Sequence, residues 1–201
     1  SARPDSTLAL QGDLADTAAT AALVPAIVAR FGRLDALVNN ASSFYPTPLG
    51  GIEEAQFDDL MATNARAPLF LAQAAAAALR ESRGAIVNLV DIYADRPIPR
   101  YLPYCMAKAA LVALTYGLAR ELGPEVRVNA VCPVLVEQGF VERLAPESFA
   151  ARREHQIRVT PLHRLGHPDE VAESIWWLTS SAAMMTGAVL ELDFGLHLTS
   201  V

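Results

Sequence analysis

Lysine is almost absent from this sequence. Lys108 is the only lysine among 201 residues, whereas arginine occurs 15 times. The formal net charge at pH 7 is −6, and no segment concentrates residues of one charge. Such a chain lacks the basic surface that binds nucleic acid or an anionic membrane, so we expect neither as a partner. Arginine cannot replace lysine where a compact point charge is needed, so the residues near Lys108 indicate whether its charge has a role.

Cysteine and long apolar runs are also scarce. The two cysteines, Cys105 and Cys132, are 27 positions apart and form no Cys-x-x-Cys motif, which predicts a reducing compartment and no zinc site. The longest apolar run, around 67–79, is interrupted by Gln73 and is too short to span a bilayer. No signal peptide is visible. With 52% hydrophobic and 19% charged residues, we expect a cytoplasmic globular domain.

The apolar patterns alternate between strand and helix. Strands are predicted over Leu8–Gln11, Leu34–Val38, Ala85–Val90, Val126–Val131 and Val189–Asp193. Helices are predicted over Thr17–Arg30, Glu53–Thr63, Ala65–Glu81, Pro103–Leu122, Phe149–Arg158 and Pro168–Ser180. The second and third of these are two helices, or one helix kinked near Pro68. The alternation predicts one α/β domain over 1–201, a doubly wound Rossmann-type parallel sheet with helices on both faces. Ligands of such folds bind beyond the carboxyl ends of the strands.

One pair of side chains has the spacing of an acid/base site. Tyr104 and Lys108 are four residues apart on a predicted helix, so they share one face. A cation beside a phenol favours the phenolate, so we expect the pKa of Tyr104 to be lowered toward neutrality. The same spacing also occurs on ordinary helix surfaces, and Tyr116 with Arg120 is similar.

Polar residues follow the predicted strands. Asp91 comes after a buried strand, and Asn39-Asn40-Ala41 ends another. Each has a structural alternative, because aspartate caps helices and asparagine favours turns. Asn64 lies where two predicted helices meet and can equally cap or break a helix. His163 and His167 are four apart, but Gly166 and Pro168 disfavour a helix that would present both to a metal, so we expect no metal site.

Together, these motifs carry a family resemblance. They are Asp13-Leu14, Asn39-Asn40-Ala41, Asn64, Tyr104-x-x-x-Lys108 and Val128-Asn129-Ala130-Val131-Cys132-Pro133. Their order and spacing, over essentially the whole chain, resemble the short-chain dehydrogenase/reductase family. The resemblance implies that Tyr104 donates the proton, that Lys108 lowers the tyrosine pKa and holds the nicotinamide ribose, and that Asn64 supports a proton-relay water. The cofactor-binding residues that it implies are Asp13, Leu14, Asn40, Ala41, Ser42, Tyr104, Lys108 and Pro133.

One departure from the family narrows the expected chemistry. The family usually has serine thirteen residues before the tyrosine, where this chain has Asp91. A hydroxyl donates to a carbonyl oxygen as negative charge develops there, whereas an ionised carboxylate opposes that charge. A carboxylate suits instead a C=N substrate, whose nitrogen must gain a proton during reduction. The residues therefore favour an imine over a ketone.

Asp91 and the segment 40–49, Asn-Ala-Ser-Ser-Phe-Tyr-Pro-Thr-Pro-Leu, look like those of pteridine reductases and dihydromonapterin-type reductases. This resemblance implies that Phe44 stacks on a pterin, that Ser42 contacts cofactor or pterin, and that Asp91 and Tyr104 supply or relay protons. It also implies NADPH as cofactor and a homotetramer. Two alternatives remain: a short-chain reductase of another imine or carbonyl, and a catalytically silent dinucleotide-binding protein.

Two family features are missing from the sequence. No Gly-x-x-x-Gly-x-Gly precedes Leu8, although this family begins with a strand, a glycine-rich turn and a helix that hold the cofactor pyrophosphate. We therefore expect this sequence to lack about one βαβ unit, on the order of 40 residues. Val134 stands where the family has glycine, so the segment 134–140 either differs from the family or also lacks residues.

Overall fold

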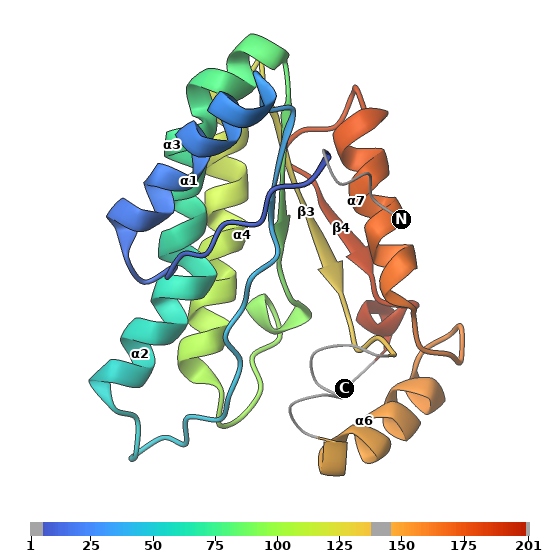
Figure 1. Ribbon diagram of the computed structural model, residues 1–201. Helices are drawn as coiled ribbons and strands as arrows, with labels where there is room; N and C mark the ends of the chain where they lie inside the picture. Colours follow the sequence, from blue (N-terminus) through green and yellow to red (C-terminus); the bar gives the residue numbers. More distant parts are fainter. Residues whose placement is uncertain (1–5, 138–145, 200–201) are drawn as a thin grey trace.

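The computed structural model describes residues 6–137 and 146–199 (Figure 1). Its sheet has four parallel strands in the order β1-β2-β3-β4. Their bounds are Ala36–Asn39 for β1, Ala85–Leu89 for β2, Arg127–Pro133 for β3 and Val189–Leu192 for β4. Helices connect successive strands, so all carboxyl ends lie at one edge of the sheet. The predicted α/β class is confirmed.

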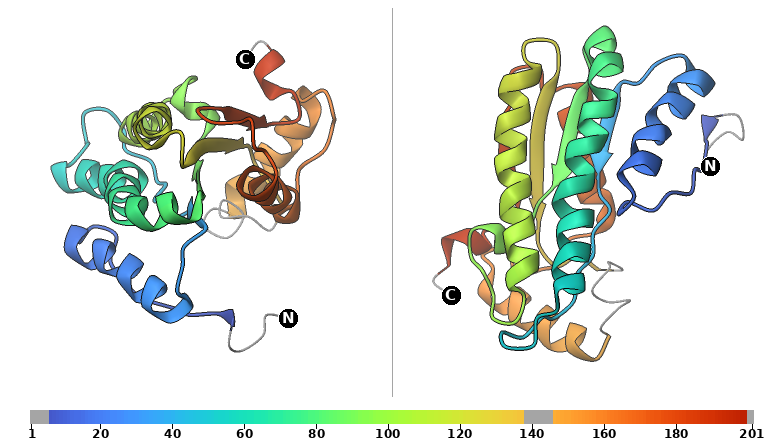
Figure 2. Two further views of the ribbon diagram at one scale, coloured as in Figure 1. Left: turned by 90° about the horizontal axis from the view of Figure 1, so that it is seen from above. Right: turned by 90° about the vertical axis from the view of Figure 1, so that its left-hand side faces the viewer.

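Helices cover both faces of the sheet. On one face lie α3 (Ala67–Ser82) and α4 (Leu102–Leu122), while α1 (Thr17–Phe31) packs against α3 (Figure 2). On the other face lies α7 (Pro168–Ser180). Two further α-helices lie among the described residues: α2 (Glu54–Met61) before α3, and α6 (Pro146–Val159) near the carboxyl ends of the strands.

Strand β2 joins the two halves of the core. Ile86 packs with α3 and α4 on one face, while its neighbour Val87 packs with Leu178 of α7 on the other, and all three are fully buried. Alternate side chains of a strand point to opposite faces, so a strand covered on both faces needs a continuous apolar run. This explains why the run 85–90 predicted β2 well.

The prediction of a strand over Leu8–Gln11 is wrong. Leu8 and Leu10 are both 41% exposed, and the segment pairs with no strand in the part of the chain that the structure describes. A strand persists only when a neighbour satisfies its backbone groups, and the described sheet offers this segment none. The following helix α1 matches its prediction. Asp16 caps its first turn, and Gly32 ends it at φ +78°, a conformation that favours glycine.

The expected break between the second and third helices is a widened turn. A π-helical segment, η2 (Ala62–Arg66), runs from α2 into α3. It lies before Pro68, which has no N–H to donate to the carbonyl four residues earlier. The chain therefore remains helical across this point, and η2 carries the buried Asn64.

Helix α4 is the one helix among the described residues that is long and apolar enough to cross a membrane by length and composition alone. The core helix of a soluble protein passes the same test. Here α4 packs against α2 and β3, and it carries the buried polar side chains of Tyr104 and Lys108.

Arg127 of β3 ties the sheet to the end of α7. Its guanidinium donates to the carbonyl oxygens of Leu178 at 2.6 Å, Thr179 at 3.0 Å and Ala182 at 3.0 Å. These carbonyls lie at the carboxyl end of α7, where a helix leaves acceptors without intrahelical partners and where positive charge is favourable.

We expect Arg127→Ala to lower the free energy of unfolding by about 2 kcal/mol, because charge-assisted hydrogen bonds to these carbonyls are lost. Urea unfolding of the purified protein measures this. Arg120→Ala is the matched control, since Arg120 is exposed on α4. An equal loss in both variants would contradict the capping role.

Candidate active site

Asp91 and Tyr104 meet just beyond the carboxyl end of β2. Asp91 begins a short 3-10 turn, η3 (Ile92–Ala94), and its Oδ1 accepts a hydrogen bond from the Tyr93 amide at 3.0 Å. Tyr104, in the first turn of α4, donates from its Oη to Asp91 Oδ2 at 2.6 Å. Tyr104 is only 4% exposed. A phenol and a carboxylate are thus joined by a short hydrogen bond that is largely screened from water.

Lys108 lies one turn further along α4 on the same face. Its Nζ donates to the carbonyl oxygen of Leu89 at 2.8 Å and lies 5.6 Å from the centroid of the Tyr104 ring. The side chain is buried. The single ammonium of the chain is therefore placed beside the Tyr104–Asp91 pair by the four-residue spacing.

The electrostatics of this cluster differ from the expectation for Tyr104. Burial and the charge of Asp91 raise the pKa of Tyr104 well above its ordinary value, so the prediction of a lowered pKa is wrong for this structure. The Lys108 ammonium is bonded to a backbone carbonyl and faces the Tyr104 ring. Tyr104 is accordingly a neutral phenol in the resting site, and its O–H donates a hydrogen bond to Asp91.

Burial also shifts the two charged partners. It raises the pKa of the Asp91 carboxyl, although the hydrogen bonds from Tyr104 and from the Tyr93 amide and the charge of Lys108 oppose this. It lowers the pKa of Lys108 to about 8, against the opposing effect of the Asp91 charge. The charge of each group thus favours the ionised form of the other, against the effect of burial.

Asn64 and Ser42 form a second polar group beside the pair. Asn64 Oδ1 accepts from Ser42 Oγ at 2.7 Å, and its Nδ2 donates to the carbonyl oxygens of Leu60 at 2.9 Å and Ser43 at 3.0 Å. The amide therefore fixes the loop after β1 against the widened turn η2. The Ser42 hydroxyl also lowers the pKa of Tyr104, against the larger effects of burial and Asp91.

Phe44 lies among aromatic rings at the edge of this cluster. It stacks on Tyr101, with ring centroids 4.6 Å apart and an angle of 12° between planes. It also meets Tyr104 edge-on, at 4.8 Å and 74°. The sequence analysis missed Tyr101, although an aromatic residue three positions before Tyr104 at the start of a helix was an available signal.

The other predicted cofactor residues occupy two places. Asn40 and Ala41 are exposed directly after β1, and Pro133 ends β3, so these three share the edge of the sheet that carries Asp91. Asp13 and Leu14 precede α1 in a turn where Asp13 Oδ1 accepts from the Ala15 amide. No hydrogen bond within residues 6–137 and 146–199 joins that turn to the Tyr104 cluster. Of the segment 134–140, residues 138–140 lie outside the described chain.

Three buried polar side chains form a chain of hydrogen bonds among the elements that carry the cluster. Asn39 Nδ2 donates to Asn88 Oδ1 at 2.8 Å, and Asn88 Nδ2 donates to Thr115 Oγ1 at 2.9 Å. All three residues are at most 8% exposed. They link β1, β2 and α4, and the candidate residues lie on or directly after these elements. An asparagine inside an otherwise apolar strand was the signal for Asn88, which the sequence analysis did not use.

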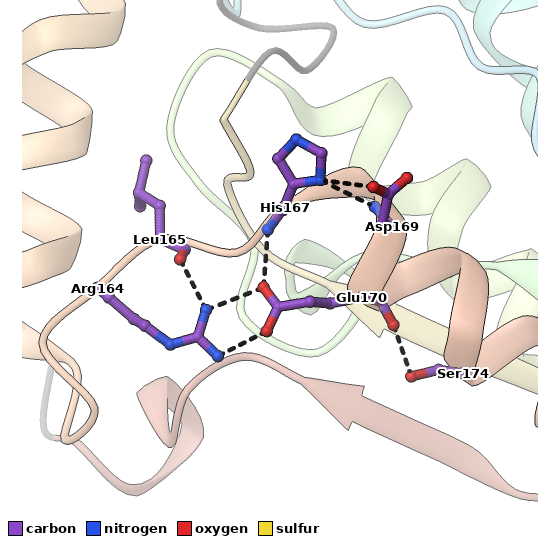
Figure 3. Close-up of polar contacts among 6 residues, drawn as sticks. All are labelled: Arg164, Leu165, His167, Asp169, Glu170 and Ser174. Carbon is purple, nitrogen blue, oxygen red and sulfur yellow. Dashed lines mark hydrogen bonds and ion pairs between the residues drawn. The ribbon is translucent and has the colours of Figure 1, made fainter.

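His167 has a structural role at the start of α7 (Figure 3). Its ring accepts from the Asp169 amide, while Glu170 accepts from the His167 amide, so the two form a capping box. Glu170 also pairs with Arg164 through both of its oxygens, at 2.6 and 2.9 Å. His163 lies outside this network, and its Nδ1 is 3.0 Å from the carbonyl oxygen of Ile157.

Comparison with known proteins identifies the class of protein that this fold and site define. The family model described as "Enoyl-(Acyl carrier protein) reductase" matches residues 1–197. A solved short-chain dehydrogenase/reductase from Brucella melitensis, titled glucose/ribitol dehydrogenase, superimposes with a TM-score of 0.89 at 28% identity, covering 97% of this chain and 78% of that one.

Curated relatives agree on the family but differ in their named substrates. Pteridine reductase 1 of Leishmania tarentolae is 35% identical, over 98% of this chain and 80% of the relative. That alignment extends over 239 positions, more than this chain contains, so the relative has segments that are absent here. The 3-oxoacyl-[acyl-carrier-protein] reductase FabG of Staphylococcus aureus is 31% identical, over 94% and 77%. The chain belongs to the short-chain dehydrogenase/reductase family.

The coupling of Lys108 to Asp91 can be measured directly, because Lys108 is the only lysine. Protein labelled with ¹³C-lysine should give one Cε resonance, titrating near pH 8 in the folded state. In Asp91→Asn, we expect a still lower pKa, since the carboxylate charge that raises it is removed while burial remains. A midpoint near the ordinary value of 10.5 in both proteins would contradict this coupling.

Proposed function

We propose that the protein is a cytoplasmic reductase of pterin C=N bonds that uses NADPH. The observation that carries the proposal is the hydrogen bond between Tyr104 and Asp91, at 2.6 Å and beyond the carboxyl end of β2. In the family this aspartate replaces a serine hydroxyl, so the site holds a proton acceptor where a ketone reductase would hold a donor. Position 91 therefore has no serine hydroxyl to donate to a carbonyl oxygen.

The proton chemistry follows from this pair. Reduction of a C=N bond places an electron pair on nitrogen, which must then gain a proton. Asp91, whose raised pKa favours uptake of a proton, can hold that proton at Oδ2 and deliver it to the nitrogen. Tyr104 donates to the same oxygen, so its own proton can replace the one transferred. Phe44 packs edge-on against the Tyr104 ring, and the Lys108 ammonium lies over its face.

The residues present fit the nicotinamide half of the cofactor. Lys108 and Tyr104 are the groups that would hold the nicotinamide ribose, and exposed Asn40 and Ala41 would line the cofactor beyond β1, with Ser42 and Pro133 beside them. Asp13 and Leu14 would contact the adenine end. NADPH supplies the hydride when it is bound. The polar groups at the ends of three adjacent parallel strands support this assignment.

Phe44 is the proposed stacking surface for the pterin. Its ring is already held at a fixed angle by Tyr101 and Tyr104, so a flat heterocycle would meet an ordered aromatic wall. Asn64 would support a water that refills the proton relay, because its amide is fixed next to Ser42. A carbonyl substrate remains the alternative, favoured by relatives such as the acyl-carrier-protein reductase.

We expect Tyr104→Phe to lower kcat for dihydrobiopterin by about 10²-fold or more, since a general acid contributes 10²–10⁴-fold. The fold should survive, because the ring packing is kept. Steady-state oxidation of NADPH measures the rate, and circular dichroism checks the fold. Tyr116→Phe is the control, since Tyr116 is exposed further along α4. Undiminished turnover in Tyr104→Phe would remove this residue from the mechanism.

Asp91→Ser tests the substrate class. A hydroxyl cannot hold the proton that the C=N nitrogen needs, so pterin reduction should fall by about 10²-fold. Any residual ketone reduction should fall less or rise, because serine can donate to a developing oxyanion. The measurement is the ratio of kcat/KM for dihydrobiopterin to that for a ketone, before and after the substitution. Equal losses for both substrates would refute the imine assignment.

We also propose a homotetramer. Support comes from large apolar side chains at the surface of α7 and the segment after it, where Trp176 is 73% exposed, Trp177 44% and Met184 100%. Aromatic residues and methionine are enriched at protein–protein interfaces, and neighbouring exposed apolar side chains are typical of such sites. Sedimentation equilibrium of the wild type should give four chains per particle, and Trp176→Glu should reduce that number. A monomeric wild type would overturn the proposal.

A further inference from the structure

The segment that carries Asp91 is closed on itself by backbone hydrogen bonds. The Ala94 amide donates to the Asp91 carbonyl oxygen, and the Arg96 amide donates to the Ile92 carbonyl oxygen, both at 2.9 Å. We call residues 91–96 the Asp91 turn. The two hydrogen bonds connect the far end of the turn, at Arg96, to Asp91 at its start.

Arg96 attaches this turn to the end of the chain. Its guanidinium donates from Nη2 to the carbonyl oxygen of His197 at 2.5 Å, and from Nη1 to that of Thr199 at 3.5 Å. These carbonyls belong to residues 193–199, which follow β4 and which we call the C-terminal turn. The two turns are a hundred residues apart in sequence, yet they lie side by side (Figure 2).

A buried carboxylate, that of Asp193, holds the C-terminal turn together by hydrogen bonds. Asp193 is 3% exposed and directly follows β4. Its Oδ1 accepts from the Gly195 amide at 3.0 Å, and its Oδ2 accepts from the His197 amide at 2.6 Å and lies 2.8 Å from His197 Nδ1. The residue whose carbonyl holds Arg96 is therefore itself bonded twice to Asp193.

Close packing fixes the other side of the C-terminal turn. Gly195 has φ +83°, and a Cβ there would lie 2.8 Å from Pro161 Cγ. A Cβ on Gly166 would likewise lie 2.8 Å from the Phe194 ring. The Arg164 guanidinium lies over that ring, 4.8 Å from its centroid, while it pairs with Glu170 (Figure 3). The C-terminal turn is thus held between the start of α7 and the Asp91 turn.

We propose that Arg96 is a positioning residue, which sets the place of the Asp91 carboxylate by tying the Asp91 turn to the C-terminal turn. This inference rests on the proposed function in one respect, that Asp91 handles the proton of the reaction. Proton transfer requires the carboxylate within hydrogen-bond reach of both Tyr104 and the substrate nitrogen. A misplacement of about 1 Å at such a site can cost on the order of 10²-fold in rate.

Hydrogen–deuterium exchange tests the attachment without any substrate. The readout is the exchange rate of the Tyr93 and Ala94 amides, which are bonded to Asp91. Arg96→Ala should raise it by about tenfold, the equivalent of one lost charge-assisted hydrogen bond. Arg100→Ala is the matched control, because it removes the same charge from an exposed side chain in the same loop. Unchanged exchange in Arg96→Ala, or an equal rise in the control, would overturn the proposal.

Steady-state kinetics test the consequence for catalysis. Arg96→Ala should lower kcat by about 10- to 100-fold with KM changed less than about threefold, because proton transfer rather than binding is disturbed. Arg96→Lys should recover part of the rate, since an ammonium can still donate to the His197 carbonyl. A rise in KM with kcat unchanged would contradict the positioning role. A failure of Arg96→Lys to recover any of the rate would contradict it as well. Urea unfolding of each variant checks that the fold persists.

The two proposals can fail separately. If the wild type reduces ketones but not dihydrobiopterin, the proposed substrate is wrong, and the same kcat comparison is then made with the ketone. If the exchange rates respond to Arg96→Ala as expected, the attachment stands whichever substrate is used. If the wild type reduces dihydrobiopterin while Arg96→Ala leaves both exchange and kcat unchanged, the pterin assignment stands and the role of Arg96 falls.

Discussion

The hydrogen bond between Tyr104 and Asp91 is the interaction on which the rest of this site depends. It keeps a phenol and a carboxylate together where burial raises the pKa of each, and the positive charge of Lys108 opposes that rise for the carboxylate. The fold supplies the conditions for it. Strand β2, buried on both faces, brings Asp91 to the carboxyl edge of the sheet, and α4 presents Tyr104 and Lys108 on one face.

This pair also gives the short-chain reductase framework its particular chemistry here. In the usual arrangement a hydroxyl at the position of Asp91 donates to a developing oxyanion. A carboxylate reverses the direction of the hydrogen bond, because Tyr104 becomes the donor and Asp91 the acceptor. In the proposed mechanism, the proton relay ends on a group that can pass a proton to nitrogen. Three contacts surround the pair. Asn64 binds the Ser42 hydroxyl, Phe44 packs against the Tyr104 ring, and the C-terminal turn binds Arg96.

Much of the fold was predictable, and the failures have physical causes. Continuous apolar runs identified β2 and β3, and capped amphipathic segments gave α1 and α7, because those signals are local. The strand expected over Leu8–Gln11 did not form, since strand identity depends on a partner rather than on composition. The spacing of Tyr104 and Lys108 predicted their shared helix face, but it did not predict the raised pKa of Tyr104. Burial outweighs a nearby charge, and the depth of a side chain cannot be read from spacing.

The central claim is that the Tyr104–Asp91 pair serves the reduction of a pterin C=N bond. The most direct measurement is the rate of NADPH oxidation by the purified protein with dihydrobiopterin, set against a panel of ketones at equal concentrations. The account predicts turnover that depends on the pterin and exceeds turnover of every ketone tested. Turnover of ketones without turnover of the pterin would contradict it, and would place the chain among the carbonyl reductases of the same family.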